Sequence, residues 1–142
     1  MSEETAQALR DFMAARSLCA IATVTSDSRP EAAYVAYTSN ENHHLIVGTS
    51  SKSRKYQNLL QNQAAAVVIA DTEGEVQYEG TVEVITPEQY QAAFTAGEFP
   101  KLPGFDKYRS DPSQVYLKIT PTWIRFIIHG ETDQITEITE FA

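Results

Sequence analysis

The sequence has little cysteine, few positive charges and no long apolar segment. Its single cysteine, Cys19, excludes an internal disulfide, and its place in the apolar run 18–24 indicates a small buried side chain. No stretch approaches the ~20 apolar residues that span a bilayer, and the acidic N-terminus is unlike a secretory signal. We therefore expect a cytoplasmic protein without a membrane partner.

Positive charge is scarce, with 11 Lys and Arg residues against 19 Asp and Glu and a net charge of −8. Such an acidic chain repels nucleic acid, so we expect no nucleic-acid partner. The motifs of a P-loop, a Rossmann dinucleotide site, a nucleophile elbow and a Cys-x-x-Cys redox site are also missing. His43 and His44 are interpreted as surface residues of a turn, and we predict no metal site because further ligands are not visible nearby.

The pattern of apolar residues predicts a mainly β (α+β) protein whose 142 residues form a single domain, 1–142. Turn residues separate short strands in antiparallel order, which favours a small barrel with peripheral short helices. The tail from residue 131 has weak patterning and stays unassigned. Expected helices are 3–16, 52–62 and 87–97; expected strands are 18–25, 31–38, 44–48, 64–70, 75–85, 115–119 and 123–129; 98–112 is expected to be a loop.

Two of the expected strands carry further information. The strand 31–38 is largely apolar on both faces, which predicts that both faces are covered, the second by another subunit or a flat ligand. The strand 75–85 alternates apolar and polar residues, so one face is expected to be buried and the other exposed. Gly80 in its middle indicates a bulge or a close backbone approach.

The segment Gly48-Thr-Ser-Ser-Lys-Ser-Arg-Lys55 lies between an expected strand and an expected helix. It holds three of the chain's cations and four hydroxyl groups. Positive charges, hydroxyl donors and the free N–H groups of a helix start all favour a phosphate group. An ordinary polar helix start with serine capping has the same composition, so the segment alone leaves both interpretations open.

A longer set of motifs resembles the pyridoxamine 5′-phosphate oxidase-like FMN-binding split-barrel family. These motifs are Arg29-Pro30, the strand 31–38, His44-Leu-Ile-Val-Gly-Thr49, Ser53-Arg-Lys-Tyr-Gln-Asn-Leu59 and Asn62-Gln-Ala-Ala-Ala-Val-Val68. The resemblance covers residues 5–85 well and the C-terminal strands more loosely. It implies an antiparallel split β-barrel that binds FMN between the two subunits of a homodimer.

The resemblance also implies roles for individual residues. Thr49 and Ser50 would donate hydrogen bonds to the phosphate, Arg54 and Lys55 would neutralise it, and Trp123 would approach from the partner subunit. The strand 33–38 would lie along the isoalloxazine ring, with Gln77 near its edge. The full set of cofactor-binding candidates is Ala33, Tyr34, Val35, Ala36, Thr38, Gly48, Thr49, Ser50, Ser53, Arg54, Lys55, Gln77 and Trp123.

The sequence departs from the vitamin B6 oxidases of this family at two places. Those enzymes carry an arginine where Ala33 stands, and a C-terminal Arg-x-His-like motif that Trp123-Ile-Arg-Phe-Ile-Ile-His129 lacks. The sequence therefore predicts an FMN-dependent oxidoreductase of unknown small-molecule substrate and electron donor, with no identifiable catalytic acid or base. The alternative is a non-catalytic carrier or sensor of the same fold, which binds flavin, a deazaflavin or haem.

Overall fold

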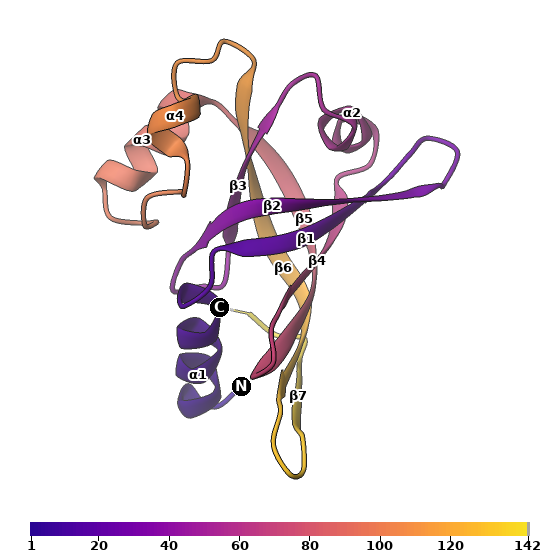
Figure 1. Ribbon diagram of the computed structural model, residues 1–142, viewed down its shortest axis with the longest axis vertical. Helices are drawn as coiled ribbons and strands as arrows, with labels where there is room; N and C mark the ends of the chain where they lie inside the picture. Colours follow the sequence, from indigo (N-terminus) through magenta and orange to yellow (C-terminus); the bar gives the residue numbers. More distant parts are fainter. Residues whose placement is uncertain (142) are drawn as a thin grey trace.

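The structure is a computed structural model that describes residues 1–141, and it consists of one strongly curved sheet with short helices at its margins (Figure 1). None of the described helices is long and apolar enough to cross a membrane. The helices are α1 (Glu3–Ala14), α2 (Arg54–Gln61), α3 (Pro87–Thr95) and α4 (Phe105–Tyr108). The strands are β1 (Leu18–Val24), β2 (Pro30–Ser39), β3 (Leu45–Ser50), β4 (Ala64–Ala70), β5 (Gly74–Ile85), β6 (Gln114–Ile128) and β7 (Gln134–Ile138).

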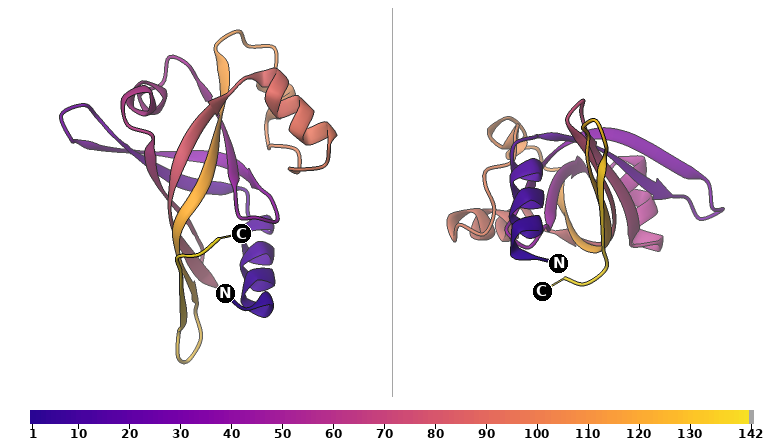
Figure 2. Two further views of the ribbon diagram at one scale, coloured as in Figure 1. Left: turned by 180° about the vertical axis from the view of Figure 1, so that it is seen from behind. Right: turned by 90° about the horizontal axis from the view of Figure 1, so that it is seen from below.

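The sheet closes on itself. Its strands follow the order β3-β2-β1-β4-β5-β6-β7, and an additional antiparallel pairing between β3 and β6 joins the first six strands into a barrel. The view from below in Figure 2 shows these strands curving around a common interior. β7 lies outside the closed ring and extends the sheet from β6. The mainly β barrel with peripheral helices is therefore confirmed.

The barrel is split between β2 and β3. Only the last part of β2 pairs with β3, from Tyr37 opposite Val47 to Ser39 opposite Leu45. The first half of β2 pairs with β1 alone, so the β1–β2 hairpin extends away from the barrel (Figure 1). α2 lies in the angle between this hairpin and β3, and it packs against β1. The split thus places the start of α2 beside the first half of β2.

The interior of the barrel is apolar, and α1 covers one side of it. Ser2 caps α1 by accepting a hydrogen bond from the Thr5 N–H, and the helix buries Leu9 and Met13 against the barrel. Cys19 is buried in the wall of this core, as the sequence predicts, and burial raises the pKa of its thiol to about 12.

The segment 98–112, which its prolines predict to be a loop, contains a short helix. α4 forms inside it, and its Phe105 joins Phe99 and Leu102 in a second apolar cluster beneath α3. Tyr90 of α3 connects the two parts, because its hydroxyl accepts a hydrogen bond from the Leu102 N–H at 2.7 Å. The segment is therefore anchored to the barrel through Phe99, Leu102 and Phe105, which share this cluster with Ile46 and Tyr116 of the barrel strands.

One strand prediction near the C-terminus was wrong, and the segment left unassigned forms a strand. The expected break at Thr120-Pro121 does not occur, and β6 runs continuously from 114 to 128. The register with β5 shifts so that Gly80 faces Pro121 and Glu79 faces Trp123, which leaves Thr122 as an extra residue. This bulge accommodates a proline that cannot donate to the ladder, and it confirms the irregularity expected at Gly80. The unassigned tail forms β7 because β6 offers it a free edge.

The prediction that His43 lies on the surface was also wrong. His43 takes a positive φ of 64° in the β2–β3 turn, and this conformation turns its side chain inward until only 4% is exposed. Burial lowers the pKa of the imidazole to about 4, so the ring is neutral at physiological pH. Within residues 1–141, no three His, Cys, Asp or Glu residues form a group able to hold a metal ion.

Candidate functional site

Hydroxyl groups gather where β3 ends and α2 begins. Ser53 is the N-cap of α2, and its Oγ accepts hydrogen bonds from the Tyr56 N–H at 3.2 Å and from the Thr49 hydroxyl at 3.0 Å. Because both of these bonds use the oxygen as an acceptor, the hydroxyl hydrogen of Ser53 is free to donate to a ligand. Ser50 Oγ instead donates to Ser113 and accepts from the Lys52 N–H. Ser50 therefore braces the turn rather than facing a ligand.

Two consecutive cations follow the N-cap, and their surroundings differ. Lys55 is half-buried, and desolvation lowers the pKa of its ammonium group, with no opposing contribution from a carboxylate. Arg54 is 74% exposed in its side chain, and its Nη1 lies 2.8 Å from Glu31 Oε2. Lys55 is thus a partly desolvated charge with no ion pair within residues 1–141, which is a strong attractor for an anion.

A small cavity lies between these cations and the first half of β2. Its volume is about 100 Å³, well below the roughly 300 Å³ of a typical pocket for a whole organic ligand. A phosphate group can enter a space of this size, whereas a tricyclic ring system cannot. Its lining residues are Ile21, Thr23, Glu31, Ala32, Ala33, Arg54 and Lys55. We call Thr49, Ser53, Arg54, Lys55 and this cavity the junction site.

Sequence reasoning missed three polar residues of the junction site. The Asn58 Nδ2 donates to Thr23 Oγ1 and to Glu31 Oε1, both at 2.9 Å, so a hydrogen-bonded network runs behind the cavity. The position of Asn58 one helical turn after Arg54 could have revealed that the two share a face of α2. The pairing of Glu31 with Arg54 had no local signal, because β2 and α2 are separated by the whole of β3.

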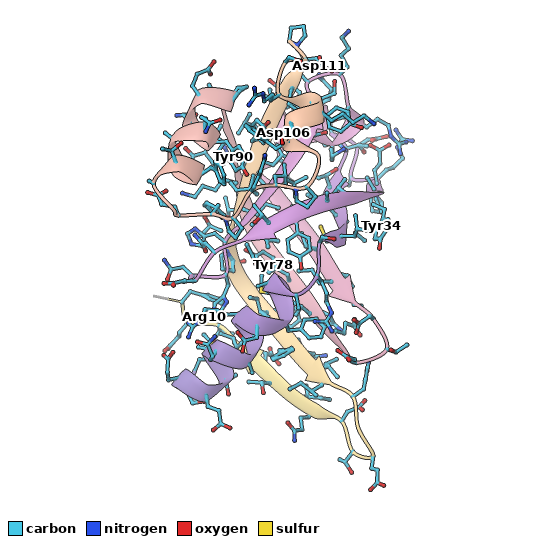
Figure 3. All side chains as sticks on the ribbon, turned by 60° about the vertical axis from the view of Figure 1, so that its left-hand side comes forward. Arg10, Tyr34, Tyr78, Tyr90, Asp106 and Asp111 are labelled. Carbon is cyan, nitrogen blue, oxygen red and sulfur yellow. The ribbon has the colours of Figure 1, made fainter. Side chains whose placement is uncertain are left out.

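The candidates on β2 divide between two faces of the strand. Ala33 and Val35 face inward beside their partners Ile21 and Cys19, and Ala33 lines the cavity. Tyr34 points away from the barrel with 73% of its surface exposed, whereas Tyr78 lies inside it (Figure 3). A single chain therefore covers one face of this strand, and the predicted second cover, by another subunit or a flat ligand, stays a prediction. The remaining β2 candidates are Ala36, which is half-buried on the outer face, and Thr38, which is buried where β2 meets β3.

The exposed face of β2 continues across neighbouring strands as an apolar surface. Ala20 of β1 lies opposite Tyr34 on one side and opposite Val68 of β4 on the other, so the three form one row. Exposed apolar residues of this kind, gathered on one face, are typical of a surface that contacts another protein. This outer patch consists of Leu18, Ala20, Ala32, Tyr34, Ala66 and Val68.

Gln77 and Trp123 lie at the far end of the same face. Gln77 of β5 is the neighbour of Val68 in the row, and its side chain donates to Glu75 at 3.1 Å. Trp123 of β6 donates from its indole Nε1 to Glu137 of β7 at 2.7 Å. In the order of the sheet, β1 and β4 separate Gln77 from β2, and β5 lies additionally between Trp123 and β2. Within one chain the structure therefore does not bring Gln77 or Trp123 to the junction site.

Gly48 has a packing role of its own. A Cβ atom at this position would lie 2.7 Å from Gln114 Nε2 and 3.1 Å from Leu102 Cδ2. The glycine thus allows β6 and the segment before α4 to approach the end of β3 closely. This contact fixes the strand end from which Thr49 and Ser50 continue into the junction site.

Comparison with known sequences and structures gives a consistent picture of the fold. A family described as pyridoxamine 5′-phosphate oxidase matches residues 5–128, whereas no curated protein sequence matches the chain. A haem-binding protein from Mycobacterium smegmatis superposes with a TM-score of 0.74 at 17% identity; the match covers 96% of this chain but only 59% of that longer one.

Two other solved structures are similar over nearly their whole length. General stress protein 26 from Bacillus anthracis gives a TM-score of 0.68 at 18% identity, covering 92% of this chain and 98% of that one. A pyridoxamine 5′-phosphate oxidase-related FMN-binding protein from Nostoc punctiforme gives 0.68 at 16% identity, covering 98% and 91%. At these identities the structures share a fold with this chain, and the fold is a split barrel.

Proposed function

Because the chain belongs to the pyridoxamine 5′-phosphate oxidase family, we propose that it binds FMN at the junction site and acts as an FMN-dependent oxidoreductase. The observation that carries this proposal is the cavity beside Lys55, a partly desolvated cation without an ion pair within residues 1–141. The proposal treats residues 1–142 as one FMN-binding domain. A cytoplasmic location is part of the proposal.

The donor set of the junction site fits a phosphate monoester. Lys55 and Arg54 would neutralise the phosphate, the free hydroxyl of Ser53 would donate to it, and Thr49 would hold Ser53 in place. The start of α2 adds unpaired backbone N–H groups and the positive end of the helix dipole. Gly48 and Ser50 would act indirectly, by fixing the strand end and the turn.

The remaining cofactor candidates fit the ring end of FMN only if a second copy of the chain takes part. A cavity of about 100 Å³ holds the phosphate but not the ring, so another surface has to complete the site. The outer patch is apolar, spans β1, β2 and β4 and shares Ala32 with the lining of the cavity, which supports a homodimer with the cofactor at its interface. In that arrangement β2 residues from Ala33 to Thr38 would lie along the ring, and Gln77 and Trp123 would approach it from the partner.

Bound FMN would supply the redox chemistry, because its ring accepts and donates electrons. The chain would bind and orient the cofactor and exclude water from it. Glu31 is the only titratable acid that lines the cavity, and it is already paired with Arg54. We therefore assign no catalytic acid or base, and the substrate is a small molecule of unassigned class.

The test begins with the visible spectrum of the purified protein, followed by titration with FMN while flavin fluorescence is recorded. We expect a bound-flavin band or saturable binding with a dissociation constant of about micromolar or below. An unchanged spectrum together with no binding at tens of micromolar FMN rejects the proposal. Riboflavin, which lacks the phosphate, is the matched control ligand and should bind more weakly.

A second candidate function is non-catalytic binding of haem or a deazaflavin as a carrier or sensor. The similar structure of a haem-binding protein from Mycobacterium smegmatis favours this alternative. Titration with haem, monitored at the Soret band, separates haem binding from flavin binding. If FMN binds, mixing with NADH or NADPH in a stopped-flow instrument separates an enzyme, whose flavin is reduced rapidly, from a carrier, whose flavin stays oxidised.

A further inference from the structure

A carboxylate lies inside the junction site beside both of its cations. The side chain of Glu31 is only 17% exposed, and it lines the cavity together with Arg54 and Lys55. Its Oε2 is 2.8 Å from Arg54 Nη1, and its Oε1 accepts a hydrogen bond from Asn58 at 2.9 Å. Each carboxylate oxygen thus has a separate partner.

The two partners hold Glu31 to different degrees. Asn58 is buried and is itself fixed by its second hydrogen bond, to the buried Thr23 hydroxyl. Arg54 is largely exposed, so it can change rotamer at little energetic cost. If the ion pair breaks, the carboxylate of Glu31 therefore stays in place, and the guanidinium of Arg54 is free to pair with another anion.

We propose that Glu31 is a specificity-determining residue that competes with the cofactor phosphate for Arg54. This inference rests on the proposed function of the junction site. With Arg54 and Lys55 positive and Glu31 negative, the cavity carries one net positive charge instead of two. A doubly charged phosphate therefore gains less binding free energy at this site than it would gain from a pair of uncompensated cations. The fixed carboxylate of Glu31 also repels it.

The consequence is a smaller difference in affinity between phosphorylated and unphosphorylated flavins than the two cations alone would give. Replacing Glu31 by an uncharged residue frees Arg54 for the phosphate. Glu31→Gln is the preferred change, because the glutamine amide oxygen can still accept the Asn58 hydrogen bond. We expect Glu31→Gln to bind FMN about tenfold more tightly than the unchanged protein, with riboflavin affinity unchanged.

The experiment measures the dissociation constants of FMN and riboflavin by fluorescence titration for three proteins: unchanged, Glu31→Gln and Glu131→Gln. Glu131 lies exposed in the turn after β6, so its variant is a matched control for the loss of one negative charge. Glu31→Ala is a second neutral variant, in case one of the two substitutions impairs folding, and thermal melting confirms the folded state of each protein.

The outcomes separate this inference from the proposed function. If Glu31→Gln binds FMN more tightly than the unchanged protein and Glu131→Gln does not, the result supports both the inference and the proposed function. If Glu31→Gln binds FMN and the unchanged protein does not, the result supports the competition but rejects FMN as the natural ligand. Equal or weaker FMN binding by folded Glu31 variants, in a protein that does bind FMN, overturns the inference and leaves the function standing. Failure of every folded protein to bind FMN overturns both.

Discussion

The junction site and the outer patch differ in how far the contacts of their side chains are satisfied within a single chain. At the junction site, most polar groups other than Lys55 already have partners: Ser53 bonds Thr49 and Tyr56, and Glu31 bonds Arg54. On the outer patch, the apolar side chains around Tyr34 are exposed, and nothing within residues 1–141 covers them. The comparison suggests a site in two parts, in which local chain geometry builds the phosphate end and association of two chains builds the ring end.

The largest expected effect comes from a charge in the outer patch. Tyr34→Asp places two carboxylates in a symmetric dimer interface, so we expect a monomer by light scattering, at the 15.8 kDa mass of one chain instead of twice that value. FMN affinity should fall at least about a hundredfold because the ring end is lost. Tyr108→Asp is the control, since Tyr108 is an exposed tyrosine on α4, outside the patch. If the protein without any substitution is already a monomer, the proposal that two chains together build the site is contradicted.

A smaller effect is expected from the phosphate end alone. Lys55→Met removes the half-buried cation, and we expect FMN affinity to fall about thirtyfold while riboflavin affinity and the dimer stay unchanged. Lys52→Met is the control, because Lys52 is exposed and does not line the cavity. Equal losses for FMN and riboflavin would mean that Lys55 acts on the ring end or on the fold.

The smallest effect is a dependence on pH. Burial lowers the pKa of Lys55 below that of an ordinary lysine, so its positive charge is lost at a lower pH than usual. Affinity for FMN should be full at neutral pH and fall severalfold as the pH rises through that lowered pKa. Riboflavin affinity should stay constant over the same alkaline range, and Lys55→Met should lose the FMN dependence. A flat FMN profile would show that Lys55 does not hold the phosphate.

Much of the junction site could be predicted from the sequence because it is local. Residues 48–55 are contiguous, so a strand end, a capping serine and two cations already specify a polar corner. Contacts between distant segments had no such signal. Glu31 meets Arg54 only because β2 separates from β3, and β6 continues past Pro121 only because its bulge lies opposite Gly80. The inward turn of His43 depends on a positive φ that composition does not reveal.

The outer patch could be predicted only in part, for a related reason. Alternation along 31–38 identified two apolar faces, but one strand does not indicate which face the same chain covers. That depends on α1 and the barrel interior, which cover the side of Val35 and leave Tyr34 exposed. The sequence therefore predicts a second cover for this strand without indicating the side on which it lies.

The single thiol offers an intrinsic probe of transient opening at the β1–β2 hairpin. Cys19 sits in β1, the strand that carries the protruding hairpin, and it is almost completely shielded from solvent. An alkylating reagent can reach it only when β1 detaches transiently from its neighbours, so the labelling rate measures how often this detachment happens. Slower labelling in the presence of a ligand would report that the ligand holds the hairpin in place, without any engineered reporter group.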